Sequence, residues 1–442
     1  MKTNEGLIRA VGVRGLTAAI INFTIGAGIF VLPAVVAGKI GNAAPIAYVI
    51  CAIAMALIVM CFAEAGSRVS LSGGTYAYAE VAFGPYVGFM VAMFLWFGSA
   101  VLASAAVVNV FVDALAQFNP SLGNSVVRAM IIIVVYGGLA IVNIRGVKTG
   151  SGVVQTVTAA KLLPLLILVG FGFIAVKGVN MTWPGMPSGS DLARTSIVLI
   201  FAFTGVESAL TPSGEVINPA RTVPRAIFIA LAITTALYIA IQVVAQGVLG
   251  PELATNTKAP LAAVAQRILG DGGRVLILIG TAISTFGYVA GDMLASPRSV
   301  FALGRDNLLP NVTARVNERF ATPHVAIIIH AVFCAALAVS GTFVTLAVLA
   351  VLACLLVYLV CCFATLQLRR KNVRQEGAIP FRVPGGPVIP ILAAAVVLWL
   401  MSSSTKQEFF AVGVMFVIAT LLFFGMRMTR PSAPTIPQVV DK

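Results

Sequence analysis

The sequence predicts a polytopic α-helical membrane protein, a single domain spanning residues 1–442, and three observations lead to this prediction. Of the 442 residues, 59% are hydrophobic and only 10% are charged, whereas about a quarter of the residues in a soluble domain carry charge. Apolar runs of roughly 20 residues, the length that crosses a bilayer as a helix, recur along the whole chain. No stretch between these runs is long enough to form a separate soluble domain.

The apolar runs predict twelve transmembrane helices, and the basic residues predict their orientation. In chain order the helices are expected at 15–38, 44–67, 85–116, 126–143, 153–176, 194–216, 226–248, 273–303, 324–340, 343–366, 387–403 and 408–427. An even number of crossings places both termini on one side. Most lysines and arginines fall in the loops of that side, as in cytoplasmic loops. The chain is therefore predicted to be a multi-pass protein of the cell membrane with both termini in the cytoplasm.

Charge, cysteines and the first residues exclude other classes of protein. The net charge of +14 comes from loops between apolar runs, so topology explains it and no nucleic-acid partner is expected. The six cysteines lie inside apolar runs without zinc or disulfide spacing, so we expect packing residues, no metal and no cofactor. Residues 1–14 lack the features of a cleaved secretory signal. Two segments too short to span, 72–83 and 260–269, are expected to be re-entrant or surface helices, or interfacial loops.

The first and sixth predicted helices each contain glycine near the middle. Gly26 and Gly28 lie two residues apart, and Gly205 is followed by the acid Glu207. Glycine weakens a helix interior and lets the backbone leave helical geometry. Interrupted helices in corresponding positions of two halves indicate a transporter binding site. At a break, free amides attract a carboxylate and free carbonyls attract an ammonium, which together suit a zwitterionic amino acid. The alternative is close helix packing through small residues.

Several motifs occur in a specific order along the chain. They are Gly26-Ala-Gly-Ile-Phe30, Gly73-Gly-Thr-Tyr-Ala-Tyr78 with Phe83-Gly-Pro85, Phe201-Ala-Phe-Thr-Gly-Val-Glu207, Glu215-Val-Ile-Asn-Pro-Ala-Arg-Thr-Val-Pro-Arg-Ala-Ile227, Arg305-Asp-Asn-Leu-Leu-Pro310 and Thr322-Pro323. Each motif is weak alone. In this order, and over nearly the whole chain, the sequence resembles the amino acid–polyamine–organocation superfamily of transporters.

The resemblance implies a LeuT-like fold with a central substrate site. Residues 15–176 and 194–366 would be inverted repeats of five helices each, and helices eleven and twelve, within 387–427, would be peripheral. The substrate carboxylate would meet amides around Ala27 and Gly28. Many relatives have serine where this chain has Ala27, so backbone amides would carry more of the carboxylate. The ammonium would meet carbonyls near Thr24, Phe201 and Thr204, and Phe201 would close over the substrate or simply pack. The predicted substrate-binding residues are Thr24, Ile25, Gly26, Ala27, Gly28, Phe201, Phe203, Thr204 and Gly205.

Lys161 is predicted to be a coupling residue. It lies eight residues into the fifth predicted helix, where a charge costs at least ~2.5 kcal/mol. The alternative is that its side chain extends to the cytoplasmic interface. In sodium-independent relatives, a lysine at this place fills the position of a sodium ion, so the resemblance implies that Lys161 bridges the first, fifth and eighth helices. A buried lysine can also exchange a proton during the transport cycle.

Two acids complete the predicted site. Glu207 follows the second break and is expected to hydrogen-bond the unwound backbone and couple binding to gating, or else to be a protonated structural carboxyl. Asp292, in the eighth predicted helix, has three open interpretations: it selects a cationic side chain, pairs with Lys161, or makes an interhelical hydrogen bond. His330 is expected to pack, and Glu64 to lie near the cytoplasmic interface.

The predicted function is sodium-independent secondary transport of amino acids by alternating access, either coupled to protons or by exchange. The predicted partners are a small amino acid or amine, protons and membrane lipids. A polyamine or other organic cation is the alternative substrate, for which Asp292 is the supporting feature. An embedded enzyme is disfavoured because the sequence offers only two histidines and no metal-ligand spacing. A channel is disfavoured because two breaks at mid-membrane fit a closed site better than a pore.

Overall fold

The chain folds into a bundle of α-helices in a computed structural model. The structure describes residues 11–69, 74–146, 151–182, 185–210, 216–374 and 379–429, with the backbone alone for 151–160. The only β-type pairing in these residues is an isolated bridge between Val11 and Val216. The α-helices are α1 Val13–Thr24, α2 Gly28–Ile40, α3 Ala44–Arg68, α4 Thr75–Phe83, α5 Pro85–Met93, α6 Leu102–Ala116, α7 Ser125–Arg145, α8 Ser151–Gly172, α9 Gly189–Ile200, α10 Val206–Ala209, α11 Pro219–Leu249, α12 Pro260–Arg305, α13 His324–Ser340, α14 Phe343–Arg370, α15 Val388–Ser402 and α16 Lys406–Thr429.

Short 3₁₀ and π segments join or interrupt the α-helices. They are η1 Gly41–Ala43, η2 Phe94–Val101, η3 Pro120–Gly123, η4 Phe173–Ala175, η5 Gly178–Met181, η6 Phe201–Phe203, η8 Gly250–Thr255 and η9 Asn311–Ala314. η2 is a π-helix in the middle of the third predicted crossing. π-Helical segments are rare in proteins, and those that occur often lie at functional sites.

The all-helical, multi-pass prediction is confirmed. Among the described residues, eight helical stretches are long and apolar enough to cross a membrane, and three shorter apolar helices accompany them. The segment predicted at 260–269 is the first part of α12, and Gly270, with a φ of +68°, separates it from the longer part. The segment predicted at 72–83 forms α4 from Thr75 onward, while residues 72 and 73 lie outside the described part of the chain.

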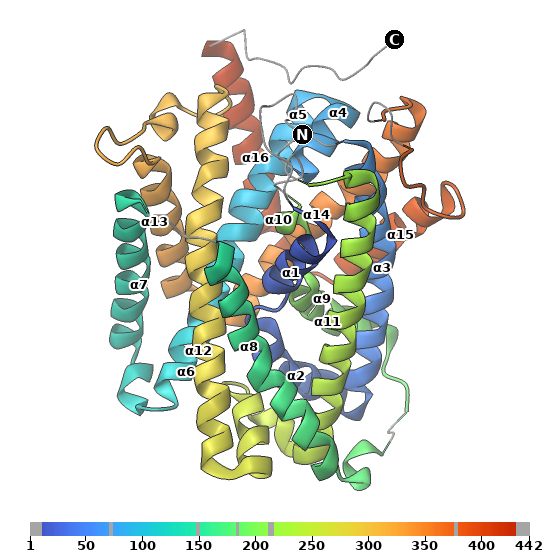
Figure 1. The fold of residues 1–442 in the computed structure, drawn as a ribbon, viewed down its shortest axis with the longest axis vertical. Coiled ribbons are helices and arrows are strands. Elements are labelled where there is room, and N and C mark those ends of the chain that lie inside the picture. The colour runs from blue at the N-terminus through green and yellow to red at the C-terminus, as the bar shows by residue number, and fades with distance from the viewer. Residues whose placement is uncertain are drawn as a thin grey trace.

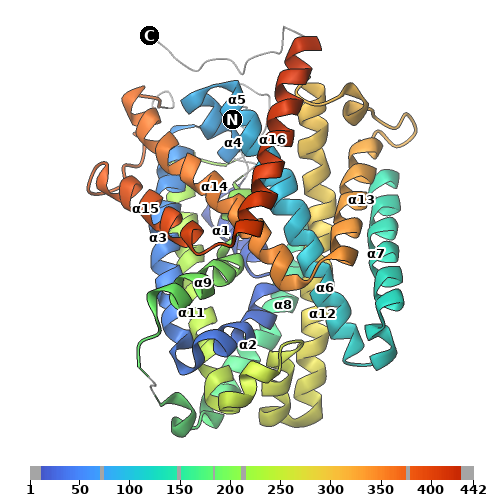
Figure 2. The same cartoon turned by 180° about the vertical axis from the view of Figure 1, so that it is seen from behind.

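The helices form an inner group and an outer group (Figures 1 and 2). In the stretch Pro85–Ala116, 83% of the most apolar 18-residue segment is buried inside the protein. The buried share of the corresponding segment is 17% in α7 and 11% in the stretch Lys406–Met428 of α16. Because α7 and α16 are apolar yet exposed, they have the surface of lipid-facing helices. α1, α2 and α9 lie at the centre, between α3 and α11 on one side and α6 and α12 on the other (Figure 1). This arrangement encloses both interrupted helices.

Candidate functional site

The first interrupted helix breaks where the glycines predict it. α1 ends at Thr24 and α2 begins at Gly28, with Ile25 at the non-helical angles φ −81° and ψ 81°. The amide of Gly26 donates to the carbonyl of Thr24 at 3.0 Å, in place of a helical bond. Ala27 caps α2 without any side-chain hydrogen bond. The amides that begin α2 are therefore not capped by a protein side chain, and the start of a helix favours anions.

The second interrupted helix breaks around Gly205. α9 ends at Ile200, the 3₁₀ turn Phe201–Phe203 follows, and Thr204 is extended before α10 begins at Val206. Gly205 has a φ of +119°. In this conformation any residue that has a side chain is strained, whereas glycine is not.

The two breaks touch each other through their backbones. A Cβ atom on Gly28 would lie 3.1 Å from the Cα of Ala202, and one on Gly205 would lie 2.8 Å from the carbonyl carbon of Phe23. All nine predicted substrate-binding residues therefore lie at or beside one junction: Thr24, Ile25, Gly26, Ala27, Gly28, Phe201, Phe203, Thr204 and Gly205. The hydroxyl of Thr24 is buried there and has no hydrogen-bond partner among the described residues.

Replacement of Gly205 by alanine is expected to abolish transport and lower the melting temperature. The left-handed backbone costs an alanine about 1–3 kcal/mol, and the new methyl group would press on the backbone of Phe23. The control is Gly137→Ala in α7, where a Cβ meets nothing within 4 Å and alanine is the better helix former. Uptake assays and thermal unfolding of the two variants test this. Normal uptake by the Gly205 variant would show that the close contact is dispensable.

A tyrosine that the sequence analysis missed connects the two breaks. The hydroxyl of Tyr238, in α11, lies 3.0 Å from the carbonyl oxygen of Thr24 and 2.9 Å from that of Ala202. The hydroxyl has one hydrogen, so it donates to one carbonyl at a time while lying within hydrogen-bond distance of both breaks. Only the folded structure reveals this contact, because Tyr238 lies in an apolar run that resembles any other.

Lys161 of α8 points at the first break. Its ammonium donates to the carbonyl of Asn22 at 2.6 Å and to that of Ile25 at 2.9 Å, and the residue is 3% exposed. The alternative of a side chain extending to the interface is therefore wrong. The expected bridge between the first and fifth helices is present. Both described hydrogen bonds go to the first break, so the expected direct contact with the eighth helix is not among the described bonds.

Glu207 faces its own break. The amide of Gly205 lies 3.1 Å from both carboxylate oxygens. Tyr358 of α14 donates its hydroxyl at 2.8 Å and the thiol of Cys354 lies at 3.6 Å. Cys354 in turn lies 3.1 Å from the hydroxyl of Ser99, in the π-helix η2. The expected hydrogen bond to the unwound backbone is present, and the same carboxylate connects the break to α14.

Asp292 makes the interhelical hydrogen bond that was one of its three interpretations. Its carboxylate accepts from the hydroxyl of Ser296 at 2.5 Å and lies 2.8 Å from Nε2 of His330. Nδ1 of His330 accepts the indole N–H of Trp96 at 3.1 Å. Because an indole only donates, the hydrogen of a neutral His330 belongs on Nε2, directed at Asp292. Lys161 bonds elsewhere, so the two charges do not pair.

The polar atoms of Asp292, His330 and Cys334 lie within 4.8 Å of one another, a spacing that could hold a metal ion. The donor set does not favour one. Both ring nitrogens of His330 already make hydrogen bonds to protein groups, and a histidine ligand needs a free lone pair. We interpret the cluster as a hydrogen-bonded link between α12, α13 and η2.

The predicted aromatic residues differ in their surroundings. The ring of Phe201 meets the ring of Phe343 edge-on, with 5.5 Å between centroids. Phe203 packs on the ring of Tyr238 at 5.3 Å and is fully buried. The hydroxyl of Thr204 donates to the carbonyl of Phe201 at 2.9 Å. Phe201 therefore lies against α14 at the edge of the junction between the two breaks, whereas Phe203 is part of the core of that junction.

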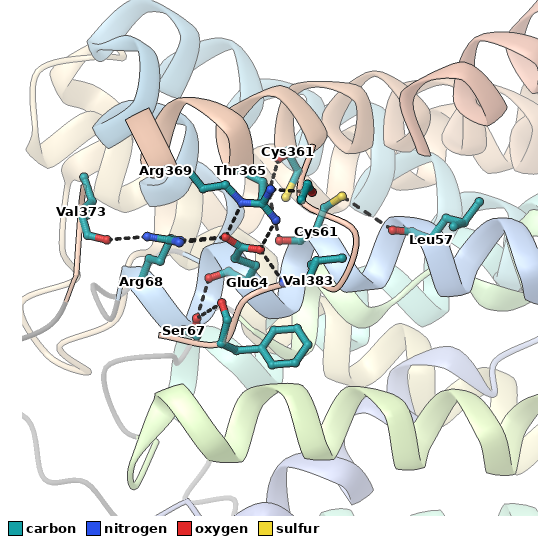
Figure 3. Close-up of polar contacts among 12 residues, drawn as sticks. Leu57, Cys61, Glu64, Ser67, Arg68, Cys361, Thr365, Arg369, Val373 and Val383 are labelled. Atoms are coloured by element: carbon teal, nitrogen blue, oxygen red, sulfur yellow. Dashed lines mark hydrogen bonds and ion pairs between the residues drawn. The ribbon is translucent and has the colours of Figure 1, made fainter. Parts of the chain in front are cut away.

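Glu64, expected near the interface, is enclosed by protein in a cluster with two arginines (Figure 3). Its carboxylate accepts from Arg68 in α3 at 2.9 Å and from Arg369 in α14 at 2.5 Å, and its side chain is 0% exposed. The amide of Val383 donates to it at 2.8 Å. Arg369 also reaches the carbonyl of Gly386. One carboxylate thus joins α3, α14 and the segment before α15.

Comparisons with known proteins give consistent matches over the chain. A family model described as amino acid permease matches residues 11–428. A methylthioribose transporter of Bacillus subtilis (strain 168) is 29% identical, over 95% of this chain and 94% of the relative. A serine/threonine exchanger of the same organism is 26% identical, over 97% of this chain and 99% of the relative. A large neutral amino acids transporter small subunit of Mus musculus is 27% identical, over 73% of this chain and 62% of the relative.

Proposed function

Because the chain belongs to the amino acid permease family, we propose that it is a sodium-independent secondary transporter that carries amino acids across the cell membrane by alternating access. The observation that carries this proposal is the junction of the two breaks, where Gly28 meets Ala202 and Gly205 meets Phe23. A backbone opened at two points in the middle of a bundle offers the polar groups that a zwitterion needs. The protein is a transporter, not an enzyme.

The proposed architecture has twelve crossings and both termini in the cytoplasm. Residues 15–176 and 194–366 form inverted repeats of a LeuT-like fold, and 387–427 lies outside them. Helices one, two, six and seven then rock against three, four, eight and nine. Tyr238, in the seventh crossing, bonds to the first and sixth, which supports their movement as one body.

The proposed substrate position is the space beside the first break. The carboxylate binds the uncapped amides of Ala27 and Gly28, and the ammonium binds carbonyls near Thr24, Phe201 and Thr204. The unpartnered hydroxyl of Thr24 supports a polar ligand here, because a buried hydroxyl without a hydrogen bond is costly.

A neutral substrate side chain is favoured over a polyamine or other organic cation. Both oxygens of Asp292 already accept hydrogen bonds, from Ser296 and His330. Asp292 is also only 6% exposed, so its carboxylate serves as a link between α12 and α13 more readily than as a contact for a cationic side chain. Among the relatives, a serine/threonine exchanger and a large neutral amino acids transporter subunit support the same class.

Coupling is assigned to Lys161 and Glu207, one at each break. The ammonium of Lys161 holds the carbonyls of Asn22 and Ile25, so it does without metal what a sodium ion would do there. Gain or loss of a proton at Lys161 would change these bonds, which supports proton coupling. Exchange of one amino acid for another is the second mode, supported by the exchanger among the relatives.

The test is uptake of a labelled mixture of amino acids by purified protein in liposomes. We expect saturable, sodium-independent uptake with counterflow, driven by an inward proton gradient or by a preloaded amino acid. A requirement for preloading, without any effect of the proton gradient, would identify an exchanger. Flux that does not saturate would indicate a channel. Uptake of a polyamine with no amino acid uptake would overturn the proposed substrate class.

A further inference from the structure

α12 begins at the lower end of the bundle in Figure 1, and Lys258, just before its start, lies between two neighbouring cavities. Their volumes are about 590 Å³ and about 400 Å³, and Lys258 lines both of them. Each volume falls in the range of roughly 300–1,000 Å³ that is usual for small-molecule sites. The orientation proposed above places this end of the bundle outside the cell.

The larger cavity is positively charged. Its lining contains the cations Lys258 and Arg274, and a neighbouring acid, Asp271, lies outside the lining and accepts a hydrogen bond from Gln266 at 2.9 Å. Arg274 donates to the backbone carbonyl of Gln117 at 2.9 Å, which orients its guanidinium without neutralising it. Lys258 is exposed, and the described residues include no ion-pair partner for it. The remaining lining residues are uncharged.

The smaller cavity differs because its own arginine is already paired. Arg128 donates to Asp113 at 2.5 Å and to the side chain of Asn109 at 2.8 Å. Lys258 is therefore the cation that can meet a ligand from either cavity. Phe343 also lines this cavity, and its ring lies edge-on to Phe201, which belongs to the second break. The smaller cavity, which shares Lys258 with the larger one, is thus lined by one member of this aromatic pair.

We propose that the two cavities form an outer vestibule in which Lys258, assisted by Arg274, holds the carboxylate of an incoming substrate before the substrate passes the Phe201–Phe343 pair. The vestibule captures carboxylate-bearing small molecules, and the final site lies beyond it. This inference rests on the proposed function, since it requires a substrate with a carboxylate. A zwitterion has no net charge, so the cations act on its carboxylate at close range, through charge-assisted hydrogen bonds, and salt weakens this attraction.

The experiment measures the initial rate of uptake by intact cells, so that substrate enters only from outside. The probe is the radiolabelled neutral L-amino acid that the wild-type protein carries best in the liposome assay. In Lys258→Gln we expect the half-saturation concentration to rise up to about fivefold at low ionic strength, as for an exposed charge contact, with an unchanged maximal rate. The increase should shrink as salt is added. The amide of the same amino acid lacks the carboxylate and carries a net positive charge, so it should lose no potency as a competitor in the variant.

The matched control is Lys177→Gln. Lys177 is exposed, and its backbone bonds to Gly247 at the end of α11, but it lines neither cavity. We expect wild-type kinetics from it. Equal kinetics in the two variants, with normal wild-type uptake, would overturn the vestibule and leave the proposed function intact. A wild-type protein that carries no carboxylate-bearing substrate would overturn both. A fall in maximal rate alone in Lys258→Gln would also contradict capture.

Discussion

Replacement of Lys161 by alanine is expected to reduce uptake by at least ~100-fold. The ammonium makes two hydrogen bonds to carbonyls at the first break, and bonds to charged groups contribute ~1.5–3 kcal/mol each. Loss of both leaves the carbonyls of Asn22 and Ile25 without these donors inside the bundle, so the break no longer has one preferred geometry. Because every tenfold change corresponds to ~1.4 kcal/mol, the sum corresponds to a hundredfold or greater loss. Liposome uptake with and without a proton gradient measures it.

Two further variants make the Lys161 experiment specific. Lys406→Ala removes an exposed lysine at the start of α16 and should transport normally. Lys161→Arg keeps a positive charge but cannot release its proton, so it separates charge from proton exchange. Retained exchange with lost gradient-driven uptake in Lys161→Arg would assign proton coupling to this residue. Full gradient-driven uptake by Lys161→Ala would remove it from the mechanism.

The second large effect is expected on stability, from Glu64→Ala. This change leaves Arg68 and Arg369 without the carboxylate that both contact, and removal of one partner from a buried ion pair costs about 3–5 kcal/mol. Thermal unfolding in detergent should show a clear fall in the melting temperature. The control is Glu252→Ala. The side chain of Glu252 is 62% exposed and that of its partner Arg267 is 52% exposed, and such exposed ion pairs contribute at most ~1 kcal/mol to stability.

Glu64→Gln distinguishes charge from hydrogen bonding in the same cluster. Glutamine keeps one oxygen acceptor for the arginines or the amide of Val383 but removes the negative charge. We expect a stability between those of wild type and Glu64→Ala. If both Glu64 variants unfold like the wild type, the cluster contributes nothing to holding α14 and the segment before α15 on α3.

The sequence was sufficient for the helical architecture and for the position of both breaks. Gly26, Gly28 and Gly205 were informative because a glycine in the middle of an apolar helix lets the backbone leave helical geometry. This effect can be recognised from the sequence alone. Lys161 was informative for a similar reason, since a charge within an apolar run needs a partner. The family resemblance added the motifs that related these positions to each other.

The sequence could not reveal partners that lie far apart along the chain. Tyr238 is one aromatic residue in an apolar helix, yet it contacts both breaks. Asp292 was left with three interpretations because its partner, His330, lies on another helix. The enclosure of Glu64 depends on Arg369, which lies on a distant helix. In each case the deciding contact joins two helices, and the sequence around either residue does not indicate which helices pack together.

The contact between the two breaks also constrains biosynthesis. The first broken helix leaves the ribosome before α8, η6 and α11, which supply Lys161, Ala202 and Tyr238. Until these segments have entered the bilayer, the carbonyls of Asn22 and Ile25 lack Lys161, and the carbonyl of Thr24 has only its local bond from the amide of Gly26. The nascent first span must therefore either remain a regular helix or keep these carbonyls hydrated. Its final shape is acquired only after insertion of α11, near the middle of synthesis of the chain.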